Sequence, residues 1–151
     1  MVQNNEVEIR EILYKSAGYS QELELRNIVL RIPLGMSLYD ENLEKEERDV
    51  HIGAFVNNKL IGVLILTKLN AADIKMRQVA VGEAYQSKKT GSKMVLFAEE
   101  YARSRGYISM ILNARNTAVP FYEKLGYEKI GDEFLEINIP HSKMSKILIG
   151  E

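Results

Sequence analysis

The sequence predicts an α/β (α+β) fold built on a mixed, mostly antiparallel sheet of about seven strands with helices on both faces. Three observations favour this fold: a hairpin pattern in the first half, a long amphipathic segment that suits a crossover helix, and a strand-rich end. The length of 151 residues suits one hydrophobic core. We therefore expect a single domain over residues 1–151.

The first half of the chain predicts a strand, a helix and then a hairpin. Apolar residues indicate the strand over 7–15, and Ser20 as N-cap begins a helix over 21–31 that the following proline and glycine terminate. The acidic run 40–49 suits a solvated loop or short helix. Strands over 50–56 and 60–67 flank an Asn-Asn-Lys turn, which is typical of a hairpin.

The second half predicts two helices among further strands. The helices are expected at 90–104 and 117–125, each followed by a terminating glycine. The strands are expected at 74–81, 108–112, 127–137 and 144–149.

The composition excludes several classes of function. Twenty Lys and Arg nearly balance 21 Asp and Glu, so no nucleic-acid partner is expected. The absence of cysteine excludes disulfides and thiol nucleophiles, and two histidines are too few for a multi-histidine metal site, so no metal is expected. Residues 1–8 lack the pattern of an export signal, and the apolar run 60–66 is far shorter than the roughly 20 residues that span a bilayer. We expect a cytoplasmic protein with no membrane partner.

The segment VAVGEAYQSKKTG at Val79–Gly91 is the most informative part of the chain. It predicts a strand, a loop and the start of a helix, whose first N–H groups have no partner inside the helix. These donors and the positive end of the helix dipole suit a phosphate. Such an arrangement is common in proteins, so phosphate binding is inferred from it only together with the motifs in the rest of the sequence.

From Met76 to Tyr127 the chain has a V-x-V strand end, a loop close to the form (Gln/Arg)-x-x-Gly-x-(Gly/Ala), a long helix and a strand. A helix that carries AVPFYEKLGY at Ala118–Tyr127 follows. This order of segments resembles the GCN5-related N-acetyltransferase (GNAT) family. Further motifs at 25–35, 112–115 and 134–144 are similar to a poorly characterised bacterial branch of predicted GNAT acyltransferases. The resemblance implies a splay between the fourth and fifth strands, where acetyl-CoA (coenzyme A) binds as cosubstrate.

The resemblance also implies the cofactor-binding residues. The pantetheine arm would pair with the backbone of the V-x-V strand, a backbone N–H there would face the thioester oxygen, and the loop would bind pyrophosphate. The set is Val79, Ala80, Val81, Gln86, Ser87, Lys88, Lys89, Thr90, Gly91, Ser92, Asn116, Phe121 and Tyr122.

Two positions depart from the family pattern. Lys89 stands where the family usually has glycine; its Cβ could hinder the approach of a pyrophosphate, while its ammonium could compensate electrostatically. Arg115 stands where asparagine is frequent, with Asn116 beside it, which puts one contact to the pantetheine arm in doubt.

Tyr122, Glu136 and His141 are the candidate catalytic residues. The resemblance implies that Tyr122 is the general acid for the leaving thiolate, although it and Phe121 could simply fill the core. Alternation places Phe134, Glu136 and Asn138 on one strand face, with His141 in the bend beyond, where a histidine suits proton transfer. The other interpretation is a loop-capping histidine and a solvated glutamate.

Five further cationic or titratable residues could recognise an anion or could form surface ion pairs: Arg26, Arg31, His51, Arg77 and Arg115. 

The favoured hypothesis is an N-acetyltransferase that moves an acetyl group from acetyl-CoA to a primary amine of a small molecule or peptide. Direct attack in a ternary complex is expected, since there is no cysteine to carry the acetyl group. A noncatalytic acyl-CoA-binding sensor and an interaction domain that keeps only the fold are the alternatives. The terminal strands could pair with a second subunit, which would give a homodimer.

Overall fold

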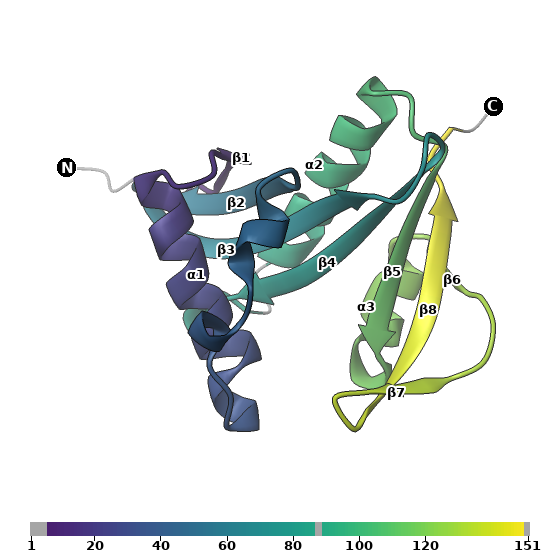
Figure 1. Ribbon diagram of the computed structural model, residues 1–151. Helices are drawn as coiled ribbons and strands as arrows, with labels where there is room; N and C mark the ends of the chain where they lie inside the picture. Colours follow the sequence, from purple (N-terminus) through teal and green to yellow (C-terminus); the bar gives the residue numbers. More distant parts are fainter. Residues whose placement is uncertain (1–5, 87–88, 150–151) are drawn as a thin grey trace. The chain divides into compact units, whose positions relative to one another are not determined.

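A computed structural model describes residues 6–86 and 89–149 (Figure 1). The chain divides into two compact units, residues 1–67 with 78–98 and residues 68–77 with 99–151. Strand β4 (Asp73–Val81) and helix α2 (Thr90–Ser104) each begin in one unit and end in the other.

The described helices and strands follow the expected alternation. The helices and 3-10 turns, besides α2, are α1 (Ala17–Leu30), η1 (Ile32–Leu34), η2 (Leu38–Asp40), η3 (Leu43–Glu46), η4 (Glu83–Tyr85), η5 (Asn116–Ala118) and α3 (Val119–Lys124). The strands, besides β4, are β1 (Glu8–Ile12), β2 (Val50–Val56), β3 (Lys59–Lys68), β5 (Ser109–Arg115), β6 (Glu128–Lys129), β7 (Phe134–Glu136) and β8 (Ile139–Ile147).

The strands form one mixed sheet in the order β1-β2-β3-β4-β5-β8-β6, with β7 beside β8. The pairings β1–β2, β2–β3 and those of β8 are antiparallel, whereas β4 and β5 are parallel. The parallel ladder joins Asp73–Met76 to Ser109–Leu112 and stops there, although both strands continue. The mixed sheet and the predicted splay between β4 and β5 are therefore confirmed.

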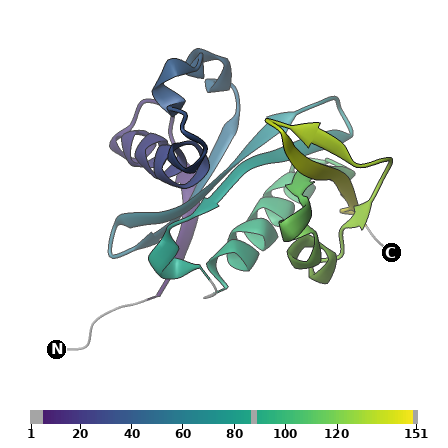
Figure 2. The same ribbon diagram turned by 90° about the horizontal axis from the view of Figure 1, so that it is seen from below.

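In the first unit, α1 covers one face of the strands and the first turns of α2 cover the other (Figures 1 and 2). The α1 side buries the apolar cluster Ile12, Tyr19, Phe55, Leu60, Val63 and Ala80. On the α2 side, Met94 packs over Gly62 of β3, where an added Cβ would lie 3.0 Å from Met94 Cε. Gly62 therefore permits the close approach of helix to strand.

In the second unit, a buried carboxylate joins helix α2 to the segments that follow it. Glu99 accepts hydrogen bonds from the Tyr127 hydroxyl (2.8 Å) and from Lys146 Nζ (2.9 Å). Lys146 also donates to the Leu125 carbonyl (2.7 Å) at the end of α3. Since Glu99 is 1% exposed, these charge-assisted bonds fix the end of the helix that carries Tyr122.

The start of α1 differs from the prediction. The helix begins at Ala17, and Ser16 rather than Ser20 is the N-cap, with its Oγ accepting from Tyr19 N–H at 3.2 Å. Apolar periodicity marks the buried face of a helix but does not choose between two nearby serines as the cap.

The strands after α3 also differ from the prediction. The expected strand 127–137 is broken at Gly131, which has φ 77°, into the short strands β6 and β7. Ile137 and Asn138 have φ of 51° and 59°, so they form a two-residue hairpin turn, and His141 lies within β8. The prediction that Asn138 shares a strand face with Glu136 and that His141 lies in a bend is wrong, because the turn comes earlier.

Candidate functional site

The predicted phosphate-binding loop follows the end of β4 in the first unit. Gly82 N–H donates to the Ile61 carbonyl of β3 (2.8 Å), and the Gln86 side-chain amide donates back to the Val81 carbonyl (2.9 Å). These bonds fold the loop onto the strand that carries the V-x-V motif. The predicted residues Ser87 and Lys88 lie outside the described residues.

Lys89 has the backbone conformation of a glycine. Its φ is 65°, in the left-handed region that glycine adopts without steric cost, and its side chain is exposed. Its carbonyl accepts from Lys93 N–H (3.0 Å), so it leads directly into α2. The sequence departure at this position therefore leaves the backbone shape of a glycine in place.

The start of α2 fits an anionic group. Thr90 is the first residue of the helix and is 1% exposed, and its hydroxyl has no hydrogen-bond partner among the residues that the structure describes. The N–H groups of the first turn, which includes Gly91 and Ser92, have no acceptor within the helix and lie at its positive end. An unused hydroxyl and free N–H donors match the needs of a phosphate.

Gln78 is a feature of this region that the sequence does not predict. It lies within β4, directly before Val79, and has φ of 55°, which a non-glycine residue rarely adopts in a strand. Its side-chain Oε1 accepts from Arg31 Nη2 at 3.2 Å. No pattern of hydrophobicity reveals such a position, because the strained residue is flanked by ordinary strand residues.

Tyr122 lies in the second unit and is 7% exposed. Its ring makes edge contacts with Phe121 (4.9 Å between centroids) and Tyr127 (5.8 Å). Its hydroxyl forms no hydrogen bond with the described residues of this unit, and burial raises the pKa of Tyr122 to about 12. The phenol therefore keeps its proton at neutral pH, as a proton donor must.

Asn116, another predicted cofactor residue of this unit, is engaged at both ends of its amide. Its Nδ2 donates to the Glu133 carboxylate, and its Oδ1 accepts from Ser142 Oγ at 2.9 Å. These two bonds leave one Nδ2 N–H and one Oδ1 lone pair of Asn116 for a contact with a pantetheine arm.

The structure brings Glu136, His141 and Phe134 together. Phe134 faces His141 across the β7–β8 ladder, and the two rings stack with centroids 5.9 Å apart. His141 is 6% exposed; its Nδ1 lies 2.7 Å from the Ile139 carbonyl and its Nε2 lies 3.3 Å from the Glu136 carboxylate. Both ring nitrogens thus face oxygen atoms. Among the described contacts of Tyr122 in this unit, none is with either residue.

Anion recognition and surface ion pairing both require a side chain that faces solvent, but Arg26 and His51 are buried. Arg26 is fully buried and donates to Glu22 (2.9 Å) and twice to Glu46 (2.8 Å each). His51 is 1% exposed, with Nδ1 2.7 Å from Glu22 and Nε2 2.9 Å from the Glu46 carbonyl. These side chains belong to a buried charge cluster, which we define as Glu22, Arg26, Glu46 and His51.

The charge cluster favours a protonated His51. Burial by itself lowers the pKa of His51, but the hydrogen bond and the attraction of Glu22, aided by Glu46, outweigh burial and raise that pKa above 6.5. With an imidazolium, two carboxylates face two cations and the cluster is neutral. Glu46 belongs to the acidic run 40–49, which is therefore not wholly solvated.

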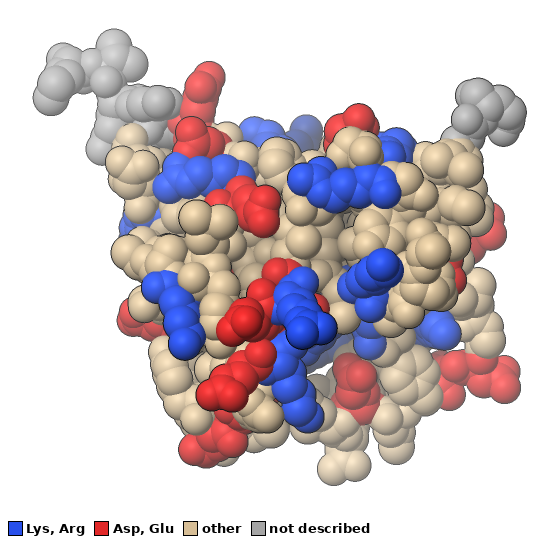
Figure 3. Space-filling view, turned by 45° about the horizontal axis from the view of Figure 1, so that its top comes forward, with Lys and Arg blue, Asp and Glu red and all other residues tan. Residues whose placement is uncertain are grey.

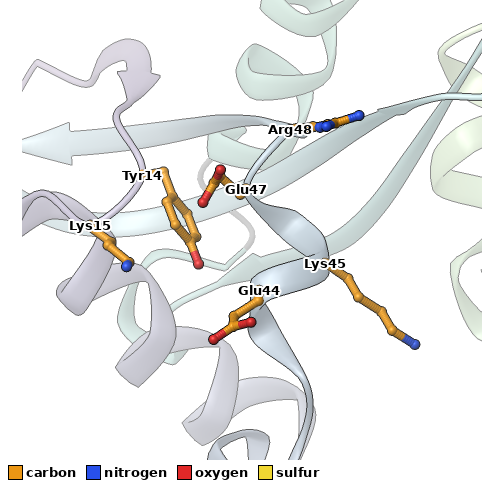
Figure 4. Close-up of a pocket in the computed structure, with 6 residues that line it drawn as sticks. All are labelled: Tyr14, Lys15, Glu44, Lys45, Glu47 and Arg48. Carbon is orange, nitrogen blue, oxygen red and sulfur yellow. The ribbon is translucent and has the colours of Figure 1, made fainter.

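A surface cleft of about 440 Å³ lies elsewhere on the first unit, lined by Tyr14, Lys15, Glu44, Lys45, Glu47 and Arg48. The side chains of Lys45 and Arg48 extend away from the Tyr14 ring (Figure 4). On the face shown in Figure 3, basic and acidic side chains are interspersed. This cleft contains none of the predicted site residues.

Within residues 6–86 and 89–149, no group of His, Cys, Asp or Glu side chains is arranged to hold a metal ion. In the same part of the chain, every helix is too short or too polar to cross a bilayer.

Comparison with known proteins decides the family. A family model described as an acetyltransferase (GNAT) domain matches residues 34–148. The chain belongs to the GNAT acetyltransferase family. Among its relatives, the uncharacterized N-acetyltransferase YjcF of Bacillus subtilis (strain 168) is 32% identical over 104 residues, which cover 68% of this chain and 74% of YjcF. The uncharacterized N-acetyltransferase YitI of the same organism is 26% identical over 128 residues, covering 80% of this chain and 85% of YitI.

Solved structures share the fold of this GNAT protein. Escherichia coli ElaA superimposes with a TM-score of 0.80 at 18% identity, covering 93% of this chain and 99% of ElaA. An aminoglycoside 6'-N-acetyltransferase complexed with coenzyme A gives a TM-score of 0.81 at 18% identity, covering 95% of this chain and 98% of that protein. At these identities the likeness establishes the GNAT fold.

Proposed function

We propose that this GNAT protein is a cytoplasmic, acetyl-CoA-dependent N-acetyltransferase. It acts as one domain, and its acceptor is a primary amine of a small molecule or peptide. The observation that carries the proposal is the start of α2, where Lys89 keeps a left-handed backbone and the buried Thr90 hydroxyl has no partner within residues 6–86 and 89–149. A structural neighbour that was solved with coenzyme A supports the choice of cosubstrate.

The backbone of Val79, Ala80 and Val81 would hold the pantetheine arm and a thioester oxygen, and the residues from Gln86 to Ser92 would hold the pyrophosphate. Acetyl-CoA supplies the acetyl group as an activated thioester. One backbone N–H that stabilises a developing oxyanion contributes about 3–4 kcal/mol in other enzymes. With no cysteine in the chain, direct transfer within a ternary complex is the simplest route.

Tyr122 is the proposed general acid. A buried phenol whose pKa is raised to about 12 remains protonated at neutral pH. Its hydroxyl has no partner among the described residues of its unit, so it could donate a hydrogen bond to the thiolate that leaves the thioester and stabilise the charge that develops on sulfur.

Glu136 and His141 are the proposed route for the proton of the attacking amine. An amine with a pKa of about 10.4 is neutral in roughly one molecule in 2,500 at pH 7, so a proton acceptor is needed. His141 Nε2 lies 3.3 Å from Glu136, whose side chain is 47% exposed. A proton taken up by His141 can thus pass through Glu136 to solvent.

Thermal unfolding with and without acetyl-CoA tests the proposal. At about 100 times its dissociation constant, a ligand adds about 2.7 kcal/mol to the free energy of unfolding. For a chain of this size the midpoint should rise by roughly 5–10 °C. Lys89→Gly is the matched variant: it keeps the left-handed backbone and removes the ammonium, so it should still bind, with a weaker dependence on salt.

No shift in either protein at millimolar acetyl-CoA would contradict the proposal and favour a domain that keeps only the fold. A shift without acetyl transfer to any of a panel of amines, peptides included, would favour a noncatalytic acyl-CoA sensor. 

A further inference from the structure

Gln78 holds a strained backbone conformation beside the proposed thioester site. Its φ of 55° lies in the left-handed region, where a glutamine side chain is disfavoured. Such a residue persists only where its surroundings determine its conformation, and strained residues cluster at functional sites. The parallel ladder between β4 and β5 stops at Met76, two residues earlier, so the contacts that hold Gln78 must come from elsewhere.

Arg31 provides such a contact. It is the C-cap residue of α1, and its side chain is 10% exposed. Its Nη2 donates to Gln78 Oε1 at 3.2 Å, while its Nε and Nη2 donate to the two carboxylate oxygens of Glu41 at 2.5 and 3.1 Å. The Glu41 fork fixes the orientation of the planar guanidinium, which in turn fixes the Gln78 amide.

The conformation of Gln78 sets the direction of the peptide groups that follow it. A reversal of the sign of φ at residue 78 rotates the N–H and carbonyl groups of Val79 and Ala80, because these are attached directly after it along β4. These are the groups proposed to hold the thioester. Loss of the anchor should therefore disturb contacts with the acetyl group more than contacts with the rest of coenzyme A.

We propose that Arg31, oriented by Glu41, is a positioning residue that holds Gln78 in its left-handed conformation and so aims the backbone donors of β4 at the acetyl thioester. This inference rests on the proposed function. Glu41 lies between η2 and η3, so the same contact also ties that segment to the thioester strand.

The test compares the affinities of acetyl-CoA and coenzyme A, measured by calorimetry on the full chain. The two ligands differ only in the acetyl group, so the ratio of their affinities isolates the contacts to the thioester. Arg31→Lys keeps the charge but loses the two-point contact with Glu41 that orients the group bound to Gln78. Gln78→Ala lacks both the anchor and a preference for positive φ. Each should reduce the wild-type ratio about fivefold, the value of one hydrogen bond, with coenzyme A affinity within about twofold of wild type.

Gln78→Gly separates the backbone from the anchor, because glycine accepts positive φ without the side-chain contact, and it should keep more of the ratio than Gln78→Ala. Arg10→Lys, at an exposed ion pair with Glu8 on β1, is the control and should not change the ratio. Unchanged ratios in folded Arg31→Lys and Gln78→Ala would overturn the inference and leave the proposed function intact. Binding of neither ligand by the wild type would overturn the proposed function, and the inference with it.

Discussion

At the scale of single residues, Lys89 and Gln78 both hold left-handed conformations, with φ of 65° and 55°. They lie at either end of the segment that would bind acetyl-CoA, from the thioester strand to the start of α2. Each costs conformational free energy that a glycine would not. Lys89 in exchange places an ammonium group beside the proposed phosphate site, and Gln78 provides a side chain that Arg31 binds.

Tyr122→Phe should lower the turnover number about 100-fold or more, because it removes the proposed proton donor. Affinity for acetyl-CoA should change little, since the ring and its edge contacts with Phe121 and Tyr127 remain. Steady-state kinetics and calorimetry on the same preparations measure both quantities. Equal turnover in the variant would remove Tyr122 from the mechanism.

His141→Ala and Glu136→Ala should each alter the pH dependence of turnover, because each removes one step of the proposed proton route. The larger effect is expected for His141, which is 6% exposed and whose Nδ1 lies 2.7 Å from the Ile139 carbonyl of the same hairpin. The pH profile of kcat checks this. Identical profiles in wild type and both variants would point instead to proton transfer through water.

At the scale of elements, the buried charge cluster docks the segment between α1 and β2. Glu46 of η3 is bound by Arg26 from α1, and its carbonyl accepts from His51 of β2. Buried charges stabilise a protein only when each has a partner of opposite charge, because burial removes their hydration. The stability of the cluster therefore depends on the imidazolium form of His51. The position of this segment should therefore be sensitive to pH.

The free energy of unfolding should fall as pH rises above about 6.5, the value for an unperturbed histidine. The pKa of His51 is raised in the folded protein, so its stabilisation is complete below the unfolded pKa and is lost as pH rises through the folded one. One such proton contributes a slope of at most about 1.4 kcal/mol per pH unit.

His51→Gln is the matched variant for this effect, because its amide can still donate a hydrogen bond but does not titrate. Urea unfolding from pH 6 to 9 should show a smaller slope in His51→Gln than in the wild type. Tyr19, whose ring contacts His51, has its pKa raised by burial to about 12 and stays protonated over this range. The same slope in both proteins would show that His51 does not titrate with unfolding.

At the scale of the whole molecule, the two compact units share β4 and α2 along the chain. Unfolding of either unit removes the packing of half of α2, and short isolated helices are marginal in water. We therefore expect a single cooperative transition. Far-UV circular dichroism and tyrosine fluorescence should give coincident unfolding curves, since tyrosines lie in both units and the chain has no tryptophan. Separate transitions would show that the units unfold independently.

Elements with a strong local signal could be predicted from the sequence. Helix α2 has the predicted bounds 90–104, because its apolar spacing and terminal glycine are local features. The β2–β3 hairpin turns at Asn57 and Asn58, with φ of 51° and 65°, as asparagine permits. The turn at Ile137 and Asn138 escaped prediction, because isoleucine is rare at positive φ and the β7–β8 pairing imposes the turn.

The sequence by itself determined the mixed fold and the GNAT resemblance, since periodicity, turn residues and motif spacing are properties of neighbouring positions, whereas the phosphate-binding role of the loop stays a prediction. Only the tertiary structure decided the state of the individual side chains. Arg26 could have been a surface cation, yet it is fully buried against Glu22 and Glu46. Burial, pairing register and the strain at Gln78 depend on contacts between segments far apart in the chain, such as Arg31 with Gln78, which no local pattern records.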